Sequence, residues 1–233
     1  MIGRFLELGL QTDNILDSIG FYEELGFKQL SVGDIWPHAY SVLSDGSINI
    51  GLHDAPLPAP MITFVLPDLA DDLVEFRSRG IEFEVEKTGN DQFNELVFPD
   101  LDGNCCIRLI EARTFSPPPF DHAESVCGHF REISLPASDL DAAGAFWQRM
   151  GFEELDQAEE PHPHIWLRGG GIVLGLHHTP DIDSPALSFQ SENISKQLAN
   201  LRQIGIATDR AKAPSGVAAL KSPEGLPIFL HGI

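Results

Sequence analysis

The amino-acid sequence predicts an α+β fold in which four βαβββ modules pair into two cup-shaped domains. Three features predict it. The two halves of the chain match each other at a constant offset, each half contains two amphipathic helices followed by short strands, and a proline-rich segment separates the halves. The chain is therefore predicted to be a tandem duplication.

The internal repeat covers most of the chain. Phe5–Leu10 aligns with Phe130–Leu135, and Gly26-Phe27 aligns with Gly151-Phe152 at the same offset. We therefore divide the chain into a first domain at residues 1–113, with modules at about 1–55 and 58–113, a proline-rich linker at 114–127, and a second domain at 128–233, with modules at about 128–180 and 183–233.

Each predicted helix begins at a capping residue and ends at a glycine. Thr12 or Asp13 can cap a helix that ends before Gly26, and Asp68 can cap a second one that ends before Gly80. The second half repeats both helices. Since each helix follows one strand and precedes three short ones, the chain contains four modules of the same kind.

Period-2 alternation in the strands predicts which side chains face away from the helices. In the first strand Leu6 and Leu8 share the apolar face, so Phe5 and Glu7 share the opposite one. The same pattern turns His53 away from the helices. A sheet curved around this uncovered face would form a cup with a carboxylate and an imidazole inside it.

The second half repeats the arrangement. Ile133 and Leu135 share the apolar face of its first strand, which leaves Glu132 on the cup side. In its fourth strand Gly175 and His177 lie on the cup side by the same alternation. Each cup is thus predicted to contain one glutamate and one histidine at equivalent positions.

Composition limits the partners. The formal net charge is -20 and the pI is near 4.6, so the surface repels nucleic acids and anionic membranes, and a cationic small molecule is a better match. No apolar run reaches the length of a membrane span and no export signal is visible, so we expect a cytoplasmic protein. Three cysteines fit neither a disulfide framework nor a zinc site.

Two motifs connect the sequence to known proteins. The segment Phe21–Phe27 and its repeat Phe146–Phe152 share an aromatic pair followed by Gly-Phe, and Pro99–Asn104 is a strand-entry motif. On these residues the chain resembles the vicinal oxygen chelate superfamily, which includes glyoxalase I, extradiol dioxygenases and bleomycin-resistance proteins. The resemblance implies a glyoxalase-like fold with two modules per cup.

The resemblance also implies a divalent metal in the catalytic members, held by His or Glu side chains on the first and last strands of the modules. The corresponding positions here are Glu7, Gly51, Met61 and Ile107 in the first cup, and Glu132, Gly175, Ala186 and Phe229 in the second. One carboxylate per cup falls short of the roughly three protein ligands of a catalytic metal, so no cofactor is expected. A metal held with the help of neighbouring histidines stays open as an alternative.

The candidate catalytic residues are Glu7 and Glu132. Each could act as a general base whose pKa a dry cup raises toward neutrality, or could be an inherited carboxylate that is solvated or hydrogen-bonded. The histidines could instead be capping or surface residues. The candidate ligand-binding residues are the two glutamates with the histidines and glycines around them, namely Glu7, His38, Gly51, His53, Glu132, His162, Gly175 and His177.

Three functions are compatible with these residues. The first is a metal-free small-molecule-binding protein of the glyoxalase/bleomycin-resistance type. The second is an enzyme, either a metal-dependent lyase or dioxygenase with a remodelled site or a metal-free isomerase that uses glutamate as its base. The third is an interaction protein whose duplicated domains form a homodimer. One scaffold supports many chemistries, so the fold alone does not choose among them.

Overall fold

The computed structural model describes residues 2–32, 36–112, 125–209 and 218–233. The first domain is an eight-stranded mixed sheet with strand order β2-β3-β4-β1-β5-β8-β7-β6. Its first module comprises β1 (Arg4–Gln11), α1 (Ile15–Glu24), β2 (Lys28–Leu30), β3 (Tyr40–Ser44) and β4 (Asn49–His53). Its second comprises β5 (Met61–Leu66), α2 (Leu69–Ser78), β6 (Val85–Lys87), β7 (Glu95–Pro99) and β8 (Cys106–Glu111).

The second domain is a seven-stranded sheet with the order β10-β11-β12-β9-β13-β15-β14. Its modules are β9 (His129–Pro136), α3 (Leu140–Arg149), β10 (Glu153–Ala158), β11 (His164–Gly169) and β12 (Ile172–His177), followed by β13 (Ala186–Ser191), α4 (Ile194–Gln203), β14 (Ala218–Lys221) and β15 (Pro227–Gly232). In both domains the first strands of the two modules pair antiparallel, β1 with β5 and β9 with β13. The prolines of the predicted linker lie outside the described residues.

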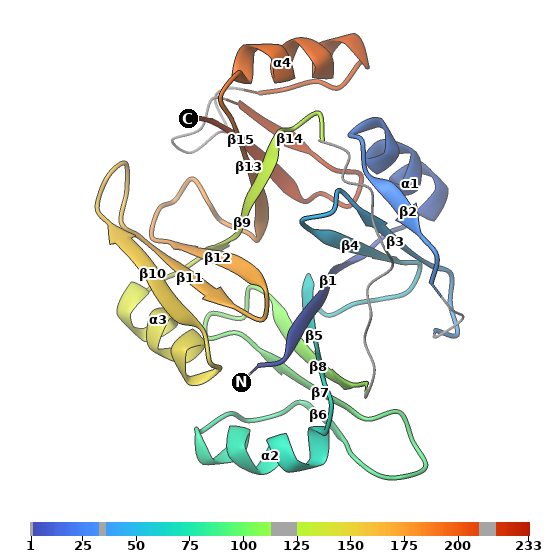
Figure 1. Cartoon of the computed structure of the whole chain (residues 1–233), viewed down its shortest axis with the longest axis vertical. Helices are drawn as coiled ribbons and strands as arrows, with labels where there is room; N and C mark the ends of the chain where they lie inside the picture. Colours follow the sequence, from blue (N-terminus) through green and yellow to red (C-terminus); the bar gives the residue numbers. More distant parts are fainter. Residues whose placement is uncertain (1, 33–35, 113–124, 210–217) are drawn as a thin grey trace.

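The two domains share one hydrophobic core. A single cluster of buried apolar side chains contains residues from both sheets. Across the domain boundary the ring centroids of Phe27 and Phe189 lie 6.5 Å apart, and those of Phe64 and Phe152 lie 6.1 Å apart. Figure 1 shows the four helices at the periphery, with the strands of both sheets between them. Two smaller apolar clusters lie apart from this core, one in each domain: Met61, Val97 and Cys106 in the first, and Ile182, Ala186, Ala219 and Phe229 in the second.

A β-bulge corrects the predicted alternation in the first strand of each half. The register of β1 against β5 shifts between Phe5 and Glu7, and the register of β9 against β13 shifts at the equivalent place. Phe5 consequently joins the core with Leu8, whereas Leu6 does not. The assignment of Leu6 to the helix face and Phe5 to the cup was therefore wrong, because the bulge inserts a residue that strict alternation does not count. Glu7 and Glu132 still reach the cups.

The first helix begins later than predicted. Its N-cap is Asn14, whose side chain accepts a hydrogen bond from the backbone N–H of Asp17 at 3.4 Å. Thr12, a predicted cap, instead pairs its hydroxyl with that of Ser18 at 2.6 Å. The cap predicted for the second helix, Asp68, is confirmed. Asn14 and Asp68 each satisfy a free backbone N–H group at the start of a helix.

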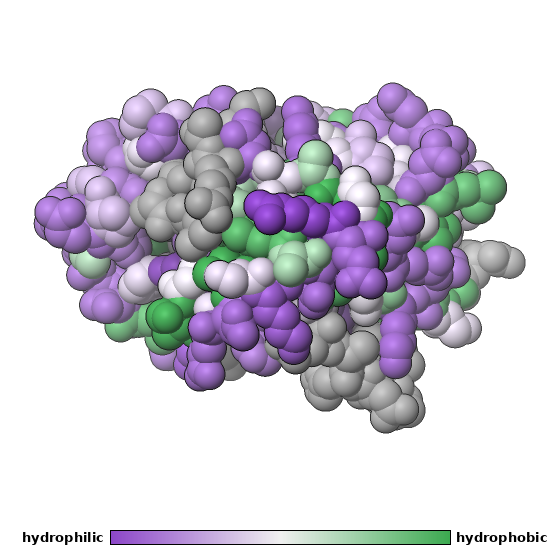
Figure 2. Space-filling model, turned by 90° about the horizontal axis from the view of Figure 1, so that it is seen from above, coloured by the Kyte–Doolittle hydropathy of each residue, from purple (hydrophilic) through white to green (hydrophobic). Residues whose placement is uncertain are grey.

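Hydrophilic residues cover most of the face shown in Figure 2, and hydrophobic residues appear between them only in small areas. None of the helices in the described part of the chain is long and apolar enough to cross a membrane.

Candidate functional site

Glu132 lies at the centre of the second cup and is almost completely buried, with 2% of its surface exposed. Its Oε1 atom accepts hydrogen bonds from the Ser134 hydroxyl at 2.9 Å and from His177 Nε2 at 2.7 Å. Its Oε2 atom accepts a short hydrogen bond from Trp166 Nε1. The carboxylate therefore has a donor for each oxygen and is held in one orientation.

These contacts determine the charge of Glu132. Burial raises the pKa of the carboxyl, but the hydrogen bond and charge of His177, with smaller contributions from Arg131 and Ser134, outweigh burial and lower the pKa to about 2. Glu132 is an anion at neutral pH. The expectation that a dry cup raises its pKa toward neutrality was wrong for this residue, because the cup supplies donors along with the burial.

A chain of two imidazoles extends from Glu132. His177 Nδ1 lies 2.9 Å from His162 Nε2, and His162 is half-buried at the edge of the cup. Because the carboxylate only accepts, His177 donates from Nε2; a neutral His177 then accepts at Nδ1 from His162 Nε2–H. Burial, followed by the charges of His177 and His164, lowers the pKa of His162. His162 is therefore neutral, with a lone pair on Nδ1.

The predicted ligand-binding glycines have another role. A Cβ atom on Gly175 would lie 2.6 Å from His177 Nε2, and one on Gly51 would lie 2.5 Å from the Cδ atom of Glu7. These approaches are far shorter than any van der Waals contact. Gly51 and Gly175 thus leave room for the side chain of the glutamate on the neighbouring strand.

The first cup repeats the array. Glu7 Oε1 lies 3.4 Å from His53 Nε2, and His53 Nδ1 lies 3.0 Å from His38 Nε2. Glu7 Oε2 accepts a short hydrogen bond from the Tyr40 hydroxyl, where the second cup uses Trp166. Both cups therefore contain a Glu–His–His array built from the same strands, and the structure brings together every glutamate and histidine that the sequence singled out.

Side chains of the protein itself fill the space beside the first array. The Trp36 ring stacks on His38 at 5.6 Å, and the Arg108 guanidinium lies 4.0 Å above the same indole. Arg108 donates to Glu95 from Nε at 3.0 Å and from Nη2 at 2.5 Å, and the Phe93 ring lies edge-on to the indole with centroids 6.1 Å apart. Among the described residues, these side chains thus pack together beside the first array.

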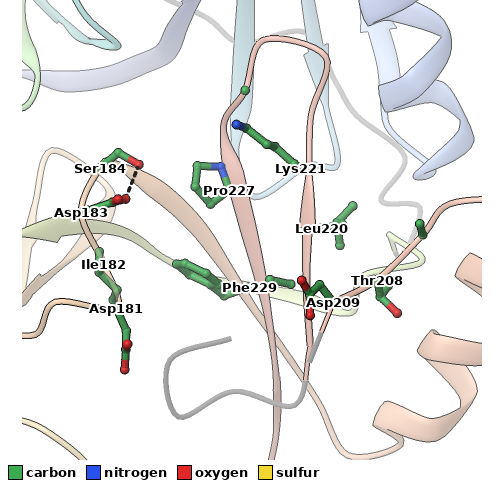
Figure 3. Close-up of a pocket in the computed structure, with 13 residues that line it drawn as sticks. Asp181, Ile182, Asp183, Ser184, Thr208, Asp209, Leu220, Lys221, Pro227 and Phe229 are labelled. Atoms are coloured by element: carbon green, nitrogen blue, oxygen red, sulfur yellow. Dashed lines mark hydrogen bonds between the residues drawn. The ribbon is translucent and has the colours of Figure 1, made fainter. Parts of the chain in front are cut away.

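Cavities open beside the second array. One of about 130 Å³, called here the histidine compartment, is lined by Glu132, Arg131, Phe229, Ile182 and four histidines, His162, His164, His177 and His231. A larger one of about 640 Å³, the β14–β15 cavity, shares Ile182 and Phe229 with it and has aspartates and Lys221 at its rim. Figure 3 shows Phe229 between Ile182 and Leu220 in this larger cavity. The two spaces adjoin at Phe229.

The metal positions that the resemblance implies carry few donor atoms. Ala186 and Phe229 pack into an apolar cluster in the second cup, and both oxygens of Glu132 are already hydrogen-bonded. Within residues 2–32, 36–112, 125–209 and 218–233, no group of three or more His, Cys, Asp or Glu side chains is placed to hold a metal ion. Apolar side chains supply no electron pair to a divalent cation.

One of those positions was assigned to the wrong residue. Ile107 belongs to the shared core on the helix side, and its neighbour Arg108 faces the first cup. The register confirms this, because Arg108 pairs with Thr63 just as Phe229 pairs with Ser188 in the second domain. The alignment of the last strands was shifted by one residue, which reverses the face of every side chain.

Sequence reasoning also missed Arg131, Trp166 and His164. Arg131 reaches the cup only because of the bulge in β9. The Trp166 and His164 side chains lie on the cup face of β11, where alternation read from Gly175 and His177 across the β11–β12 hairpin would have placed them. His164 Nδ1 bonds to the carbonyl of His162 at 2.8 Å, and its buried Nε2 atom has no protein partner among the described residues.

Comparisons with solved structures identify the fold. A catechol 2,3-dioxygenase matches with a TM-score of 0.65 and 16% identity over 99% of this chain and 87% of the other. A homoprotocatechuate 2,3-dioxygenase variant from B. fuscum in complex with HPCA matches with a TM-score of 0.63 and 15% identity, over 98% of this chain and 70% of the other. A 4-hydroxymandelate synthase mutant from Streptomyces coelicolor matches with a TM-score of 0.60 and 15% identity, over 99% of this chain and 94% of the other.

No protein-family model and no curated protein matches the sequence. The structural matches nevertheless cover almost the whole chain. This chain has the same two-domain, glyoxalase-like fold as these solved structures.

Proposed function

We propose that the second cup binds a small organic molecule. The single observation that supports this most is the pair of adjoining cavities, of about 130 and 640 Å³, that meet at Ile182 and Phe229. Ligand pockets typically measure about 300–1,000 Å³ and combine an apolar lining with a few convergent polar groups. The histidine compartment supplies the polar groups, and the β14–β15 cavity supplies the space for the body of the ligand.

A second candidate function is proton transfer without a metal, which the Glu132–His177–His162 array favours. His162 Nδ1 would accept a proton from the ligand while its Nε2–H proton moves to His177 Nδ1. His177 becomes an imidazolium beside the Glu132 carboxylate, which stabilises the positive charge, and the ligand is left as an anion. Return of the proton to another atom of the ligand would complete an isomerisation.

The names of the structural neighbours keep a metal-dependent dioxygenase as an alternative. Such an enzyme would need donors other than the pair at Ala186 and Phe229, which supply none. Elemental analysis of protein purified without chelators tests this alternative. Near-stoichiometric iron or manganese would favour it over the metal-free proposal.

Ligand-detected NMR with a library of small fragments tests binding, and Ala219→Trp places an indole in the β14–β15 cavity. We expect fragments to bind the wild-type protein and to lose binding in this variant. Val97→Trp is the matched control, because Val97 pairs with Arg108 in the first cup as Ala219 pairs with Phe229 in the second. Unchanged binding to Ala219→Trp would refute the proposed site.

Proton transfer has a separate test. For each fragment that binds, exchange of its carbon-bound hydrogen in D₂O is followed by NMR. We expect His162→Gln to slow this exchange about 100-fold, the usual contribution of a positioned general base, without removing binding. Exchange at the wild-type rate in the variant would eliminate the proton-transfer function and leave the binding function intact.

A further inference from the structure

The second cup contains a guanidinium group that the first cup lacks at the same place. In β9 the bulge brings Arg131 into the histidine compartment beside Glu132. The equivalent bulge in β1 holds Leu6 beside Glu7. The arginine of the first cup, Arg108, comes from another strand. The two cups therefore differ in where their positive charge originates.

The two arginines also differ in how fully they are paired. Arg108 uses both Nε and Nη2 on Glu95, and 7% of its side chain is exposed. Arg131 approaches Glu132 Oε2 only through Nε, at 3.5 Å, and 28% of its side chain is exposed. Within the described residues, neither Nη atom of Arg131 has a hydrogen bond or ion pair to a protein group.

Arg131 is nevertheless held in position. Its Cζ atom lies 4.7 Å from the centroid of the Trp166 ring, and Trp166 is itself fixed by its hydrogen bond to Glu132. A guanidinium stacked on an aromatic ring keeps its plane, and its outer N–H groups form a fork that matches the two oxygens of a carboxylate. The fork is thus oriented before any ligand arrives.

The carboxylate already present in the compartment is hydrogen-bonded by the protein. Both oxygens of Glu132 accept hydrogen bonds, from His177, Ser134 and Trp166, and burial, followed by the charge of Arg131, lowers the pKa of His231 to about 4. Beside Glu132, the histidine compartment therefore offers one guanidinium whose Nη groups are open to a ligand. No further carboxylate lines it among the described residues.

We propose that Arg131 binds a carboxylate of the ligand, so that the ligand is a small monocarboxylic acid with an apolar body. This inference rests on the proposed binding function and names its ligand class. The two Nη groups bind the carboxylate, and the apolar body extends past Ile182 and Phe229 into the β14–β15 cavity.

The overall charge of the chain predicts the opposite ligand, a cation. At physiological salt, however, charges separated by more than about 8 Å are largely screened, so the nearest group determines the local preference. The aspartates Asp181, Asp183 and Asp209 line the larger cavity and not the histidine compartment. A cationic probe therefore tests whether the net charge or Arg131 determines which ligand binds.

The test uses three probes with the same body, namely 3-phenylpropionate, 3-phenylpropionamide and 3-phenylpropylamine, and measures their affinities by calorimetry or NMR titration. We expect the carboxylate to bind the wild-type protein at least about tenfold more tightly than the amide, the difference of roughly 1.4 kcal/mol that one charge-assisted contact supplies. Arg131→Leu should remove this preference and leave amide binding unchanged.

Two further variants complete the design. Arg131→Lys keeps the charge without the fork and should retain part of the preference, which also covers the case in which Arg131→Leu fails to fold. Arg168→Leu removes an exposed guanidinium from the same sheet and should change nothing. Equal or tighter binding of the amide or the amine, or a preference that survives in Arg131→Leu, would overturn the inference but not the binding function. Failure of all three probes to bind would overturn the inference, and failure of the fragment library as well would overturn both.

Discussion

The two cups start from the same Glu–His–His array and end with different interiors. In the first, Trp36 and the Arg108–Glu95 pair occupy the space beside the array. In the second, the equivalent of Arg108 is Phe229, and cavities open on both sides of that ring. The array therefore forms with or without an adjoining cavity, whereas a bound ligand would need the cavity.

The Glu–His–His array that both cups share is held by hydrogen bonds, and a glycine on the neighbouring strand leaves room for it. Each glutamate lies over a glycine of the neighbouring strand, and each inner histidine contacts both the glutamate and an outer histidine. The array is therefore stable whether or not a cavity adjoins it. A buried polar network that is fully satisfied stabilises a fold, so a ligand is not needed to explain its presence in the first cup.

The largest effect is expected from substitutions at the shared glycines. Gly175→Ala and Gly51→Ala should each lower the free energy of unfolding by about 3 kcal/mol, because the new methyl group collides with the array. Urea denaturation measures the loss. Gly20→Ala, with open space around the new methyl group in α1, is the control and should be neutral or slightly stabilising. A large loss in only one cup would show that the arrays are not equivalent.

Removal of the ring that closes the first cup should have the next largest effect. Trp36→Ala should destabilise the protein by about 2.5 kcal/mol, since Arg108 and His38 lose their stacking partner. Added indole should restore part of the melting temperature by filling the space. Phe93→Ala, whose ring is 49% exposed, should lose less. A wild-type melting temperature for Trp36→Ala would mean that the first cup is not closed by this ring.

The second cup should be the more sensitive of the two to acid. His231 has a pKa of about 4 in the folded protein, because of burial and then Arg131, against about 6.5 in an unfolded chain. The unfolded state therefore binds more protons, and stability present above pH 6.5 is lost as pH falls toward 4, by about 2 kcal/mol.

Unfolding free energies measured between pH 7 and pH 4 test this window, which roughly spans the two pKa values. His231→Gln should flatten the dependence, while His129→Gln, at an exposed position, should leave it unchanged. A steep decline that persists in His231→Gln would assign the acid sensitivity to another group.

The smallest effect is expected from adding to the first cup the arginine of the second. Leu6→Arg should change the free energy of unfolding by no more than about 0.5 kcal/mol, as is usual for partly exposed positions. In an Arg131→Leu background it should not restore binding of 3-phenylpropionate, because Trp36 and Arg108 occupy the adjacent space. Restored binding would show that the two cups are interchangeable.

Local patterns in the sequence were sufficient for most of the fold. The offset between Phe5–Leu10 and Phe130–Leu135 reveals the duplication, and the glycine after each helix marks its end. The bulge in the first strand of each half could not be predicted, because leucine and arginine, the residue types at positions 6 and 131, also occur in regular strands. Its geometry depends on how β1 and β9 pair with strands far away in the sequence.

The sequence predicted which glutamates and histidines lie in the site, but not their pKa values or the cavities beside them. Alternation placed Glu132 and His177 on one face, and their contact followed from the parallel pairing of β9 with β12. The carboxylate pKa could not be predicted, since it depends on donors from β11 and β12. Cavities depend on the size of side chains such as Phe229 and Trp36 after packing, which no single position in a sequence specifies.

The common core makes each half of the chain depend on the other for folding. Because Phe27 packs on Phe189 and Phe64 on Phe152, each half covers apolar surface of the other. A half-length chain expressed alone would expose that surface and would have to pair with a second copy of itself or aggregate. Fusion into one polypeptide removes the dependence of assembly on concentration, and it also frees the two halves to diverge, one closing its hollow while the other keeps it open.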